Sequence, residues 1–379
     1  MAHRYLLGAA LSGESCRLSG VDYSEDILAT IDCLRALGAK ITVDGDRVEV
    51  RSGNFMNVSD PTLECRESGS TLRFFIPLAL CLGSRVTLRG SSRLLQRPLD
   101  VYEKICQDKG FEFLKSADGI VLYGNLRSGN YTVRGDISSQ FITGLIIALV
   151  YLGEDSSIEI IPPFESRSYV DLTLSALASF GADVKFTNEY KIEIKKSEMH
   201  AFLGKIEGDY SNAAFLDAFN RIGSDIKIQN LNSESLQGDR VYAKYFDAID
   251  RGAPTLDISD CPDLGPVLFA LAALKNGATF TGTDRLKAKE SDRGQAMHEE
   301  LIKLGGGLIF GDNSITVPKQ ELKNTGLSLD GHNDHRIVMA LSVILSAIGG
   351  EIEGAEAVKK SYPRFFEDIK RLGAEVETK

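Results

Sequence analysis

The chain has 379 residues, with 53 acidic residues against 43 basic ones and a formal net charge of −10 at pH 7. This balance excludes a typical nucleic-acid-binding surface, which needs an excess of Lys and Arg. A hydrophobic content of 43% with 25% charged residues is typical of a globular protein, and the length favours two domains.

Cysteine usage and hydropathy indicate the compartment. The six cysteines are scattered without a C-x-x-C pair, which is typical of reduced thiols and predicts a cytoplasmic location. The longest apolar stretch, residues 141–152, is well short of the roughly 20 residues that cross a bilayer. We therefore expect no membrane partner.

One module recurs along the chain. Its marker is a helical stretch that ends in a Gly turn before a strand, at residues 34–39, 105–110, 177–182, 249–253, 301–305 and 369–374. The spacing of roughly 50 to 70 residues indicates a folded supersecondary unit rather than a short solenoid repeat.

Each module is predicted to contain two helices of different character. One is apolar nearly all round, at residues 71–82, 140–152, 264–274 and 334–348, and must be buried on all sides. Strands are expected after these helices or at the matching place in the module, at 86–88, 158–160, 226–228 and 279–280. The other helix is amphipathic, as in residues 26–37, where Asp22 to Glu25 supply capping groups.

These elements predict layered α/β units around buried helices. Three modules per domain is the simplest division, and it places the domains at residues 1–204 and 205–379. Most of the buried helices follow a strand and a polar loop, at 66–70, 134–140, 209–212, 260–263 and 333–336. Only Met1 and Ala2 precede the first buried helix, so the first module is expected to lack its opening strand and loop.

The loops before the outer helices concentrate positive charge. They contain Arg93, Arg97, Arg167, Lys287, Lys289, Arg293, Lys359, Lys360 and Arg364. Each loop alone could be a solvated helix end. Cations at a helix start oppose the helix dipole, however, and their repetition predicts a small, multiply charged anionic ligand shared with the helix N-termini.

Two carboxylates accompany these cations. Asp263 precedes a buried helix and Glu290 lies within Lys289-Glu290-Ser291-Asp292-Arg293. They could be a helix cap and an ion pair, or acid and base groups. No phosphate loop or dinucleotide loop is present, and neither Cys nor a further His supports His332 and His335 as metal ligands.

These loops resemble the 5-enolpyruvylshikimate-3-phosphate synthase family over essentially the whole chain. Lys289 to Arg293 is similar to the family's K-E-[ST]-D-R, Asn333 to Arg336 to its N-D-H-R, Ser138 to Phe141 to its S-S-Q-F, and Pro262-Asp263 to its P-D. Ser166 to Tyr169 resembles S-K-P-Y, and Glu67 to Arg73 replaces N-A-G-T-A-M-R.

The resemblance implies two domains, each of three βαβαββ units, that close over a cleft. It also implies transfer of enolpyruvyl from phosphoenolpyruvate to the 5-hydroxyl of shikimate 3-phosphate with release of phosphate. No metal or organic cofactor is expected, the partners would be these two anionic substrates alone, and the chain would be a monomer.

The resemblance also assigns site residues. The catalytic residues would be Asp263, Glu290 and Lys289. Phosphoenolpyruvate would be bound by Gly69, Arg97, Gln140, Arg293, Arg336 and Lys360. Shikimate 3-phosphate would be bound by Arg4, Ser138, Ser139, Gln140, Ser166, Tyr169, Asp263 and Lys289.

One departure from the family leaves alternatives open. The family begins with P-x-S-K-S, whose Lys and Ser contact the substrates, and Met1-Ala2-His3-Arg4 resembles the family residues directly after that segment. The second domain would then lack its N-terminal strand. A start assigned too late at an internal Met, or an inactive ligand-binding remnant, would each account for this. A UDP-N-acetylglucosamine enolpyruvyl transferase is a lesser alternative, because residues 91–98 lack the Cys that it uses.

Overall fold

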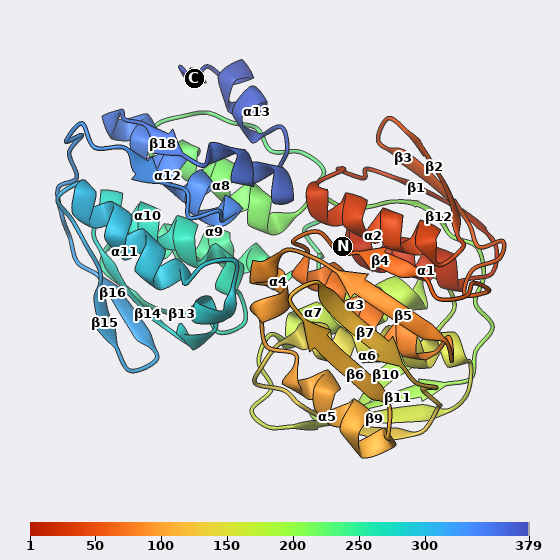
Figure 1. Ribbon diagram of the computed structural model, residues 1–379. Helices are drawn as coiled ribbons and strands as arrows, with labels where there is room; N and C mark the ends of the chain where they lie inside the picture. The colour runs from red at the N-terminus through yellow and green to blue at the C-terminus, as the bar shows by residue number, and fades with distance from the viewer. Residues whose placement is uncertain (378–379) are drawn as a thin grey trace. The chain divides into compact units, whose positions relative to one another are not determined.

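The computed structural model describes residues 1–377, and the chain folds into two compact units. The first spans Met1–Glu207 and the second begins at Gly208 (Figure 1). Each unit has its own hydrophobic core. No helix within residues 1–377 is long and apolar enough to cross a membrane.

The first unit contains three four-stranded sheets and their helices. Its elements are α1 (Ala2–Leu11), β1 (Ser15–Ser19), α2 (Glu25–Ala36), β2 (Lys40–Asp44), β3 (Arg47–Arg51), β4 (Thr62–Glu64), α3 (Gly69–Leu80), β5 (Arg85–Arg89), α4 (Ser92–Gln96), α5 (Asp100–Lys109), β6 (Glu112–Ser116), β7 (Gly119–Tyr123), β8 (Asn130–Arg134), α6 (Ser139–Leu152), β9 (Ser156–Ile161), α7 (Arg167–Ala178), β10 (Asp183–Asn188), β11 (Lys191–Lys195) and β12 (Leu203–Lys205).

The three sheets share one topology. Their strand orders are β12-β1-β3-β2, β4-β5-β7-β6 and β8-β9-β11-β10. In each sheet the first two strands are parallel and the remaining pairs are antiparallel. In β4-β5 and β8-β9 a buried helix, α3 or α6, makes the crossover that a parallel pair requires. Alternate residues of the strands, such as Val86 and Leu88 of β5, are buried against these helices.

The helices begin and end where local chemistry dictates. The Ser24 side chain accepts a hydrogen bond from the Ile27 amide and caps α2, as the sequence predicted. Ser68 caps α3 and Ser138 caps α6 in the same way. Gly153 ends α6 in the left-handed conformation, which favours glycine.

The second unit is built from α8 (Tyr210–Arg221), α9 (Tyr242–Arg251), β13 (Thr255–Asp257), α10 (Gly265–Leu274), β14 (Ala278–Thr281), α11 (Arg293–Lys303), β15 (Ile309–Gly311), β16 (Ser314–Val317), β17 (Leu329–Asp330), α12 (His335–Ile348), β18 (Ile352–Glu353) and α13 (Phe365–Arg371). Short 3₁₀ helices join them: η1 (Gly238–Val241), η2 (Pro262–Leu264), η3 (Asp284–Ala288) and η4 (Ala355–Lys360). Its sheets have the orders β13-β14-β16-β15 and β17-β18.

Two sequence predictions differ from the structure. Residues 205–208 were expected to begin the fourth module, but Lys205 is the last residue of β12, which pairs with β1 and occupies the place of the first module's missing opening strand. The strand expected at 226–228 is wrong, and residues 206–254 contain no strand. A strand forms only where a neighbouring strand pairs with its backbone hydrogen-bonding groups. The strand that precedes residues 226–228 in the chain, β12, pairs with β1 of the first unit and so is not available as that neighbour.

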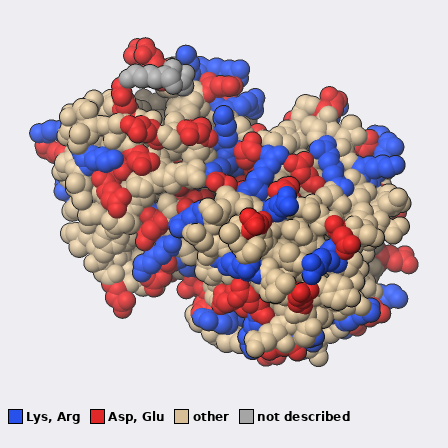
Figure 2. Space-filling model, in the orientation of Figure 1, with Lys and Arg blue, Asp and Glu red and all other residues tan. Residues whose placement is uncertain are grey.

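Charge is mixed on the surface. On the face drawn in Figure 2, the Lys and Arg side chains lie among Asp and Glu side chains on both units. The net charge of −10 is therefore not gathered into one acidic patch on that face.

Candidate active site

Arg293 organises a cluster of buried charges in the second unit. It is the first residue of α11, whose cap is the Asp292 side chain, and its own side chain is 1% exposed. The guanidinium donates from Nε to Asp334 at 2.9 Å, from Nη1 to Asp263 at 2.7 Å and from Nη2 to Glu290 at 2.8 Å. Burial lowers the pKa of Arg293, but these carboxylates outweigh that effect and raise it. Arg293 is therefore a permanent cation.

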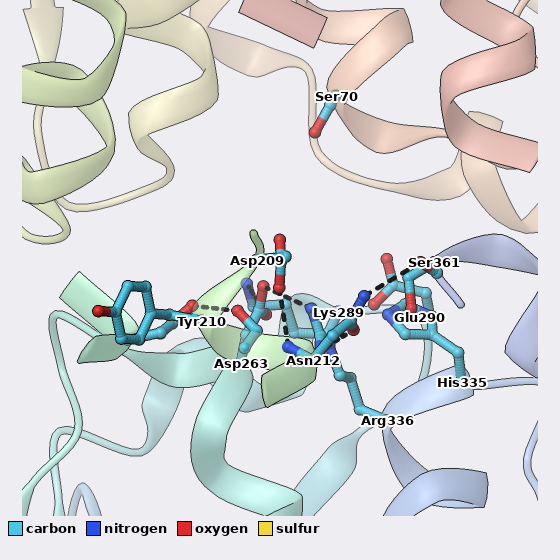
Figure 3. A network of polar contacts seen from close by, with 12 residues as sticks. Ser70, Asp209, Tyr210, Asn212, Asp263, Lys289, Glu290, His335, Arg336 and Ser361 are labelled. Carbon is cyan, nitrogen blue, oxygen red and sulfur yellow. Dashed lines mark hydrogen bonds and ion pairs between the residues drawn. The ribbon is translucent and has the colours of Figure 1, made fainter. Parts of the chain in front are cut away.

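Asp263 receives positive charge from several elements. It lies in η2, directly after β13, and accepts from Lys289 Nζ at 3.1 Å as well as from Arg293. The Nη2 atom of Arg336 is 4.0 Å from its second oxygen. Burial raises the pKa of Asp263, but Lys289, Arg293 and Arg336 outweigh it and hold the pKa well below its usual range. Figure 3 shows Asp263, Lys289 and Arg336 within this network.

Lys289 lies between η3 and α11 and is mostly buried. Burial lowers its pKa, and the positive charge of Arg293 adds to that effect, while Asp263 opposes it. Glu290 follows directly and is held by Arg293. A lysine with a lowered pKa beside a carboxylate is a suitable pair for moving a proton.

Asp334 ties α12 to this cluster. Its side chain is fully buried, caps α12 by accepting from the Arg336 amide at 2.9 Å, and accepts from Ser291 Oγ at 3.0 Å. Burial raises its pKa, but the Arg293 charge outweighs that effect and lowers it. Arg336, one residue further into α12 than His335, donates from Nη1 to Asn212 Oδ1 at 3.0 Å. Lys360, at the end of η4, donates to the Asn333 carbonyl.

Asp239 is a second buried carboxylate near Asp263. It lies in η1, is 3% exposed, and accepts a hydrogen bond from the Ser211 hydroxyl. Burial, together with the negative charge of Asp263, raises the pKa of Asp239 to about 7. Two neighbouring carboxylates thus have pKa values pushed in opposite directions, which is a frequent mark of functional sites.

A polar cluster in the first unit surrounds the start of α3. A Cβ atom at Gly69 would lie 2.7 Å from Arg97 Nη1 and 3.1 Å from Arg73 Nη1, so a larger residue here would displace the ends of these two side chains. Arg73 Nη1 donates to Gln140 Oε1 at 2.7 Å, and Gln140 Nε2 donates to Ser70 Oγ at 2.9 Å. Two guanidinium groups at a helix N-terminus form a strong anion-binding arrangement.

The remaining predicted residues of the first unit lie on α1, α6 and α7. Arg4 is buried and donates to the Tyr169 carbonyl at 2.9 Å and to Thr173 Oγ1 at 2.8 Å. Ser166 directly precedes α7 and has a left-handed φ of 54°, and its side chain makes no capping hydrogen bond to the helix. Ser138 and Ser139 stand at the start of α6.

A model of the EPSP synthase family (3-phosphoshikimate 1-carboxyvinyltransferase) matches residues 1–369. The chain belongs to this family. The resemblance inferred from the loops is thereby confirmed, and the family match favours the shikimate enzymes over the UDP-N-acetylglucosamine transferases.

Named relatives agree over the whole chain. The 3-phosphoshikimate 1-carboxyvinyltransferase of Clostridium kluyveri is 39% identical, covering 100% of this chain and 93% of that protein. The protein of the same name from Clostridioides difficile is 36% identical, covering 100% of this chain and 94% of that protein.

Solved structures show the same fold. The EPSP synthase of Acinetobacter baumannii superposes with a TM-score of 0.77 at 22% identity, covering 99% of this chain and 94% of that one. The enolpyruvyl transferase NikO from Streptomyces tendae superposes with a TM-score of 0.72 at 15% identity, covering 99% of this chain and 93% of that one. The predicted α/β enolpyruvyl-transferase fold is confirmed.

Within this member of the EPSP synthase family, the predicted residues fall into groups. In the second unit, Arg293 brings Asp263 and Glu290 together, and Lys289 and Arg336 join them at Asp263. Lys360 donates to the carbonyl of Asn333, the residue directly before Asp334, which also contacts Arg293. In the first unit, Gly69, Arg97 and Gln140 meet around Arg73, and Arg4 contacts Tyr169.

Sequence reasoning missed several polar residues of these groups. Asp334 and Arg73 lie within the matched motifs, but the sequence analysis predicted no role for either residue. Arg73 lies one helical turn after Gly69, a spacing that signals a shared helix face. Asp239 carried no local signal, and Asn212 lay in one of the polar loops without a predicted role, because their contacts join segments far apart in the chain.

His332 and His335 have different partners, since His332 Nε2 donates to Glu300 and His335 Nδ1 lies 3.9 Å from Asp334. Among residues 1–377, no group of three or more His, Cys, Asp or Glu side chains is placed to hold an ion.

Proposed function

We propose that this chain transfers the enolpyruvyl group of phosphoenolpyruvate to the 5-hydroxyl of shikimate 3-phosphate and releases phosphate. The observation that carries the proposal is the single guanidinium of Arg293, which holds both Asp263 and Glu290. Family membership and the relatives' names support the choice of substrates.

The reaction requires proton transfer at two different atoms, the 5-hydroxyl oxygen and C3 of phosphoenolpyruvate. In the addition step the 5-hydroxyl oxygen bonds to C2 of phosphoenolpyruvate, loses its proton, and C3 gains one. In the elimination step C3 loses a proton and the C2–O bond to phosphate breaks. Two carboxylates on different nitrogens of Arg293 suit this sequence: Asp263 accepts the hydroxyl proton, and Glu290, with Lys289 beside it, serves C3.

The low pKa of Asp263 would have to rise on substrate binding before this carboxylate could accept a proton effectively. In the structure, Lys289 and Arg293 donate to Asp263 and Arg336 lies close by. Anionic substrates that bind these cations would compete with Asp263 for them. Its pKa would then rise toward the range in which a carboxylate accepts a proton effectively.

The substrate-binding roles follow the family motifs. Phosphoenolpyruvate would be held by the cations Arg97, Arg293, Arg336 and Lys360 together with Gly69 and Gln140. Shikimate 3-phosphate would be held by Arg4, Ser138, Ser139, Gln140, Ser166, Tyr169, Asp263 and Lys289. Arg and Lys offset the repulsion between two substrates that each carry phosphate and carboxylate.

The finer parts of the proposal concern organisation. We propose that residues 1–204 and 205–379 act as the two catalytic domains, and that the protein works as a cytoplasmic monomer. The reaction described above assigns no step to a metal or organic cofactor. An inactive ligand-binding remnant is disfavoured, because the acid and base groups and their cationic partners are all present.

The test is a phosphate-release assay on the purified chain with both substrates. Release that requires shikimate 3-phosphate and phosphoenolpyruvate together supports the proposal. No release from a folded protein that binds both substrates would instead support the remnant. Release with a UDP-amino sugar as acceptor, and none with shikimate 3-phosphate, would assign the other transferase activity.

A further inference from the structure

A buried ion pair lies outside the charge cluster, on the same helix as Arg293. Glu300, seven residues further along α11, is 1% exposed. It accepts from His332 Nε2 at 2.9 Å, from Lys303 Nζ at 2.8 Å and from the Asp330 amide at 2.8 Å. A buried carboxylate is costly unless such donors satisfy it, so this site depends on its partners.

His332 belongs to the segment of residues 331–334 that joins β17 to α12, here called the β17–α12 loop. His332 and Asn333 have φ values of 50° and 49°, two consecutive left-handed residues that are not glycine. Such a residue is strained and persists only when its surroundings hold it. The His332 amide donates to Asp330 Oδ1 at 2.7 Å, and the His332 side chain is anchored on Glu300.

The conformation of this loop sets the positions of site residues. It turns the Asn333 carbonyl toward Lys360 and places Asp334 on Arg293 and at the start of α12. The helix α11 therefore holds the loop at two points. Arg293 of the helix binds Asp334 of the loop, and Glu300 of the helix binds His332 of the loop.

The charges around His332 favour its cationic form. Glu300 is hydrogen-bonded to it, Glu299 Oε2 lies 3.9 Å from Nε2, Asp330 is nearby, and Lys303 shares Glu300. The hydrogen bond to Glu300 raises the pKa of His332 above its usual value, against the effect of burial. Burial raises the pKa of Glu300, but hydrogen bonds from His332, Lys303 and the Asp330 amide leave it lowered.

We propose that His332 is a positioning residue for phosphoenolpyruvate binding: its hydrogen bond to Glu300 holds the β17–α12 loop in the conformation that places Arg293, Arg336 and Lys360. This inference rests on the proposed function. It predicts that the loss of His332 weakens phosphoenolpyruvate binding selectively, since the contacts of this loop lead to residues assigned to phosphoenolpyruvate, whereas most residues assigned to shikimate 3-phosphate belong to the first unit.

The test compares His332→Ala, His332→Gln and wild type. A hydrogen bond to a charged group contributes about 1.5–3 kcal/mol, so His332→Ala should raise the KM for phosphoenolpyruvate by about tenfold or more. The KM for shikimate 3-phosphate should change by less than about twofold. His332→Gln should recover most of the loss at pH 6, because its amide also donates to Glu300. The exposed His200→Ala, in the first unit, is the matched control and should leave both constants unchanged.

A pH series separates positioning from a merely structural role. Because the folded pKa of His332 is raised, the contribution of its charge is complete below about pH 6.5 and is lost as pH rises through that higher pKa. The KM of wild type for phosphoenolpyruvate should rise over this window relative to that of His332→Gln, which has no such titration.

Several outcomes would overturn the inference. They are an unchanged phosphoenolpyruvate KM in an active His332→Ala, an equal rise for both substrates, or no recovery in a folded His332→Gln. Failure of the proposed function would look different, because wild type itself would release no phosphate. In that case, direct titration of wild type and His332→Gln with phosphoenolpyruvate would still test the pH window.

Discussion

Arg293 shows how one residue can set the state of a whole site. Its planar guanidinium donates in fixed directions to Asp334, Asp263 and Glu290, which lie on separate segments. A lysine would present only a point charge and could not fix these groups relative to one another. All three carboxylates are thereby held by one buried, permanent cation.

Replacing Glu290 tests the acid and base assignment directly. Glu290→Gln keeps the size of the side chain and can still contact Arg293, so the KM values for both substrates should change little. Loss of a proton-transfer group should lower kcat by about 10²–10⁴. The exposed Glu321→Gln is the control and should turn over normally. A normal kcat in Glu290→Gln would remove this residue from the mechanism.

Asp239 should make the stability of the second unit depend on pH. With a folded pKa of about 7 against an ordinary value of 3.8, ionisation of this buried group destabilises the fold. The loss of unfolding free energy that this ionisation causes is absent below about pH 4, grows as pH rises to about 7, and is complete above about pH 7. Asp239→Asn removes the charge and can still accept from Ser211.

Thermal unfolding at pH 5 and pH 8 provides the measurement for Asp239→Asn. The midpoint of the variant relative to wild type should be higher at pH 8 than at pH 5, by roughly 3 °C or more. A difference that is constant or smaller at pH 8 would contradict the raised pKa.

At the scale of elements, the first-unit cluster depends on close packing of α3 and α6. The Tyr102 hydroxyl, buried on α5, donates to the carbonyls of Arg73 on α3 and Phe141 on α6. A Cβ atom at Gly144 of α6 would lie 2.4 Å from the Arg73 carbonyl oxygen and 2.5 Å from the Tyr102 hydroxyl. The two helices therefore approach as closely as glycine allows.

Gly144→Ala should for this reason destabilise the first unit. Helix propensity alone predicts a gain of about 1 kcal/mol, whereas overpacking of a tight core costs about 1–3 kcal/mol. Because the added methyl strikes backbone, we expect a net loss, measured as a lower denaturant midpoint. A higher midpoint would show that α3 and α6 can separate without cost.

The sequence predicted helices better than strands. The apolar run at 140–152 became α6 almost unchanged, because burial all round depends only on local composition. The strand expected at 226–228 failed because pairing depends on a partner elsewhere. The site residues were also predictable only where their contacts are local. Glu290 and Arg293 are three residues apart, so their ion pair could be expected from the sequence. The contact between Asp239 and Ser211 depends on the tertiary fold.

At the scale of the whole molecule, the chain has separate cores. Ile147 is fully buried in the first unit and Leu271 in the second. Proteins with more than one core commonly depart from a single two-state transition. Two calorimetric transitions are expected, and Ile147→Ala and Leu271→Ala should each lower a different one, at a cost of about 2–5 kcal/mol. A single transition that both variants shift equally would show that the units unfold together.

The pairing of β12 with β1 has a consequence for biosynthesis. Arg17 is opposite Leu203, so the first sheet cannot be completed until nearly all of the first unit has left the ribosome. At about 5–20 residues per second, this leaves the edge of β1 without its parallel partner for roughly 10 to 40 s. An unpaired edge strand is a template for wrong pairing. A chaperone that covers this edge until Leu203 emerges would therefore protect the nascent chain from such pairing.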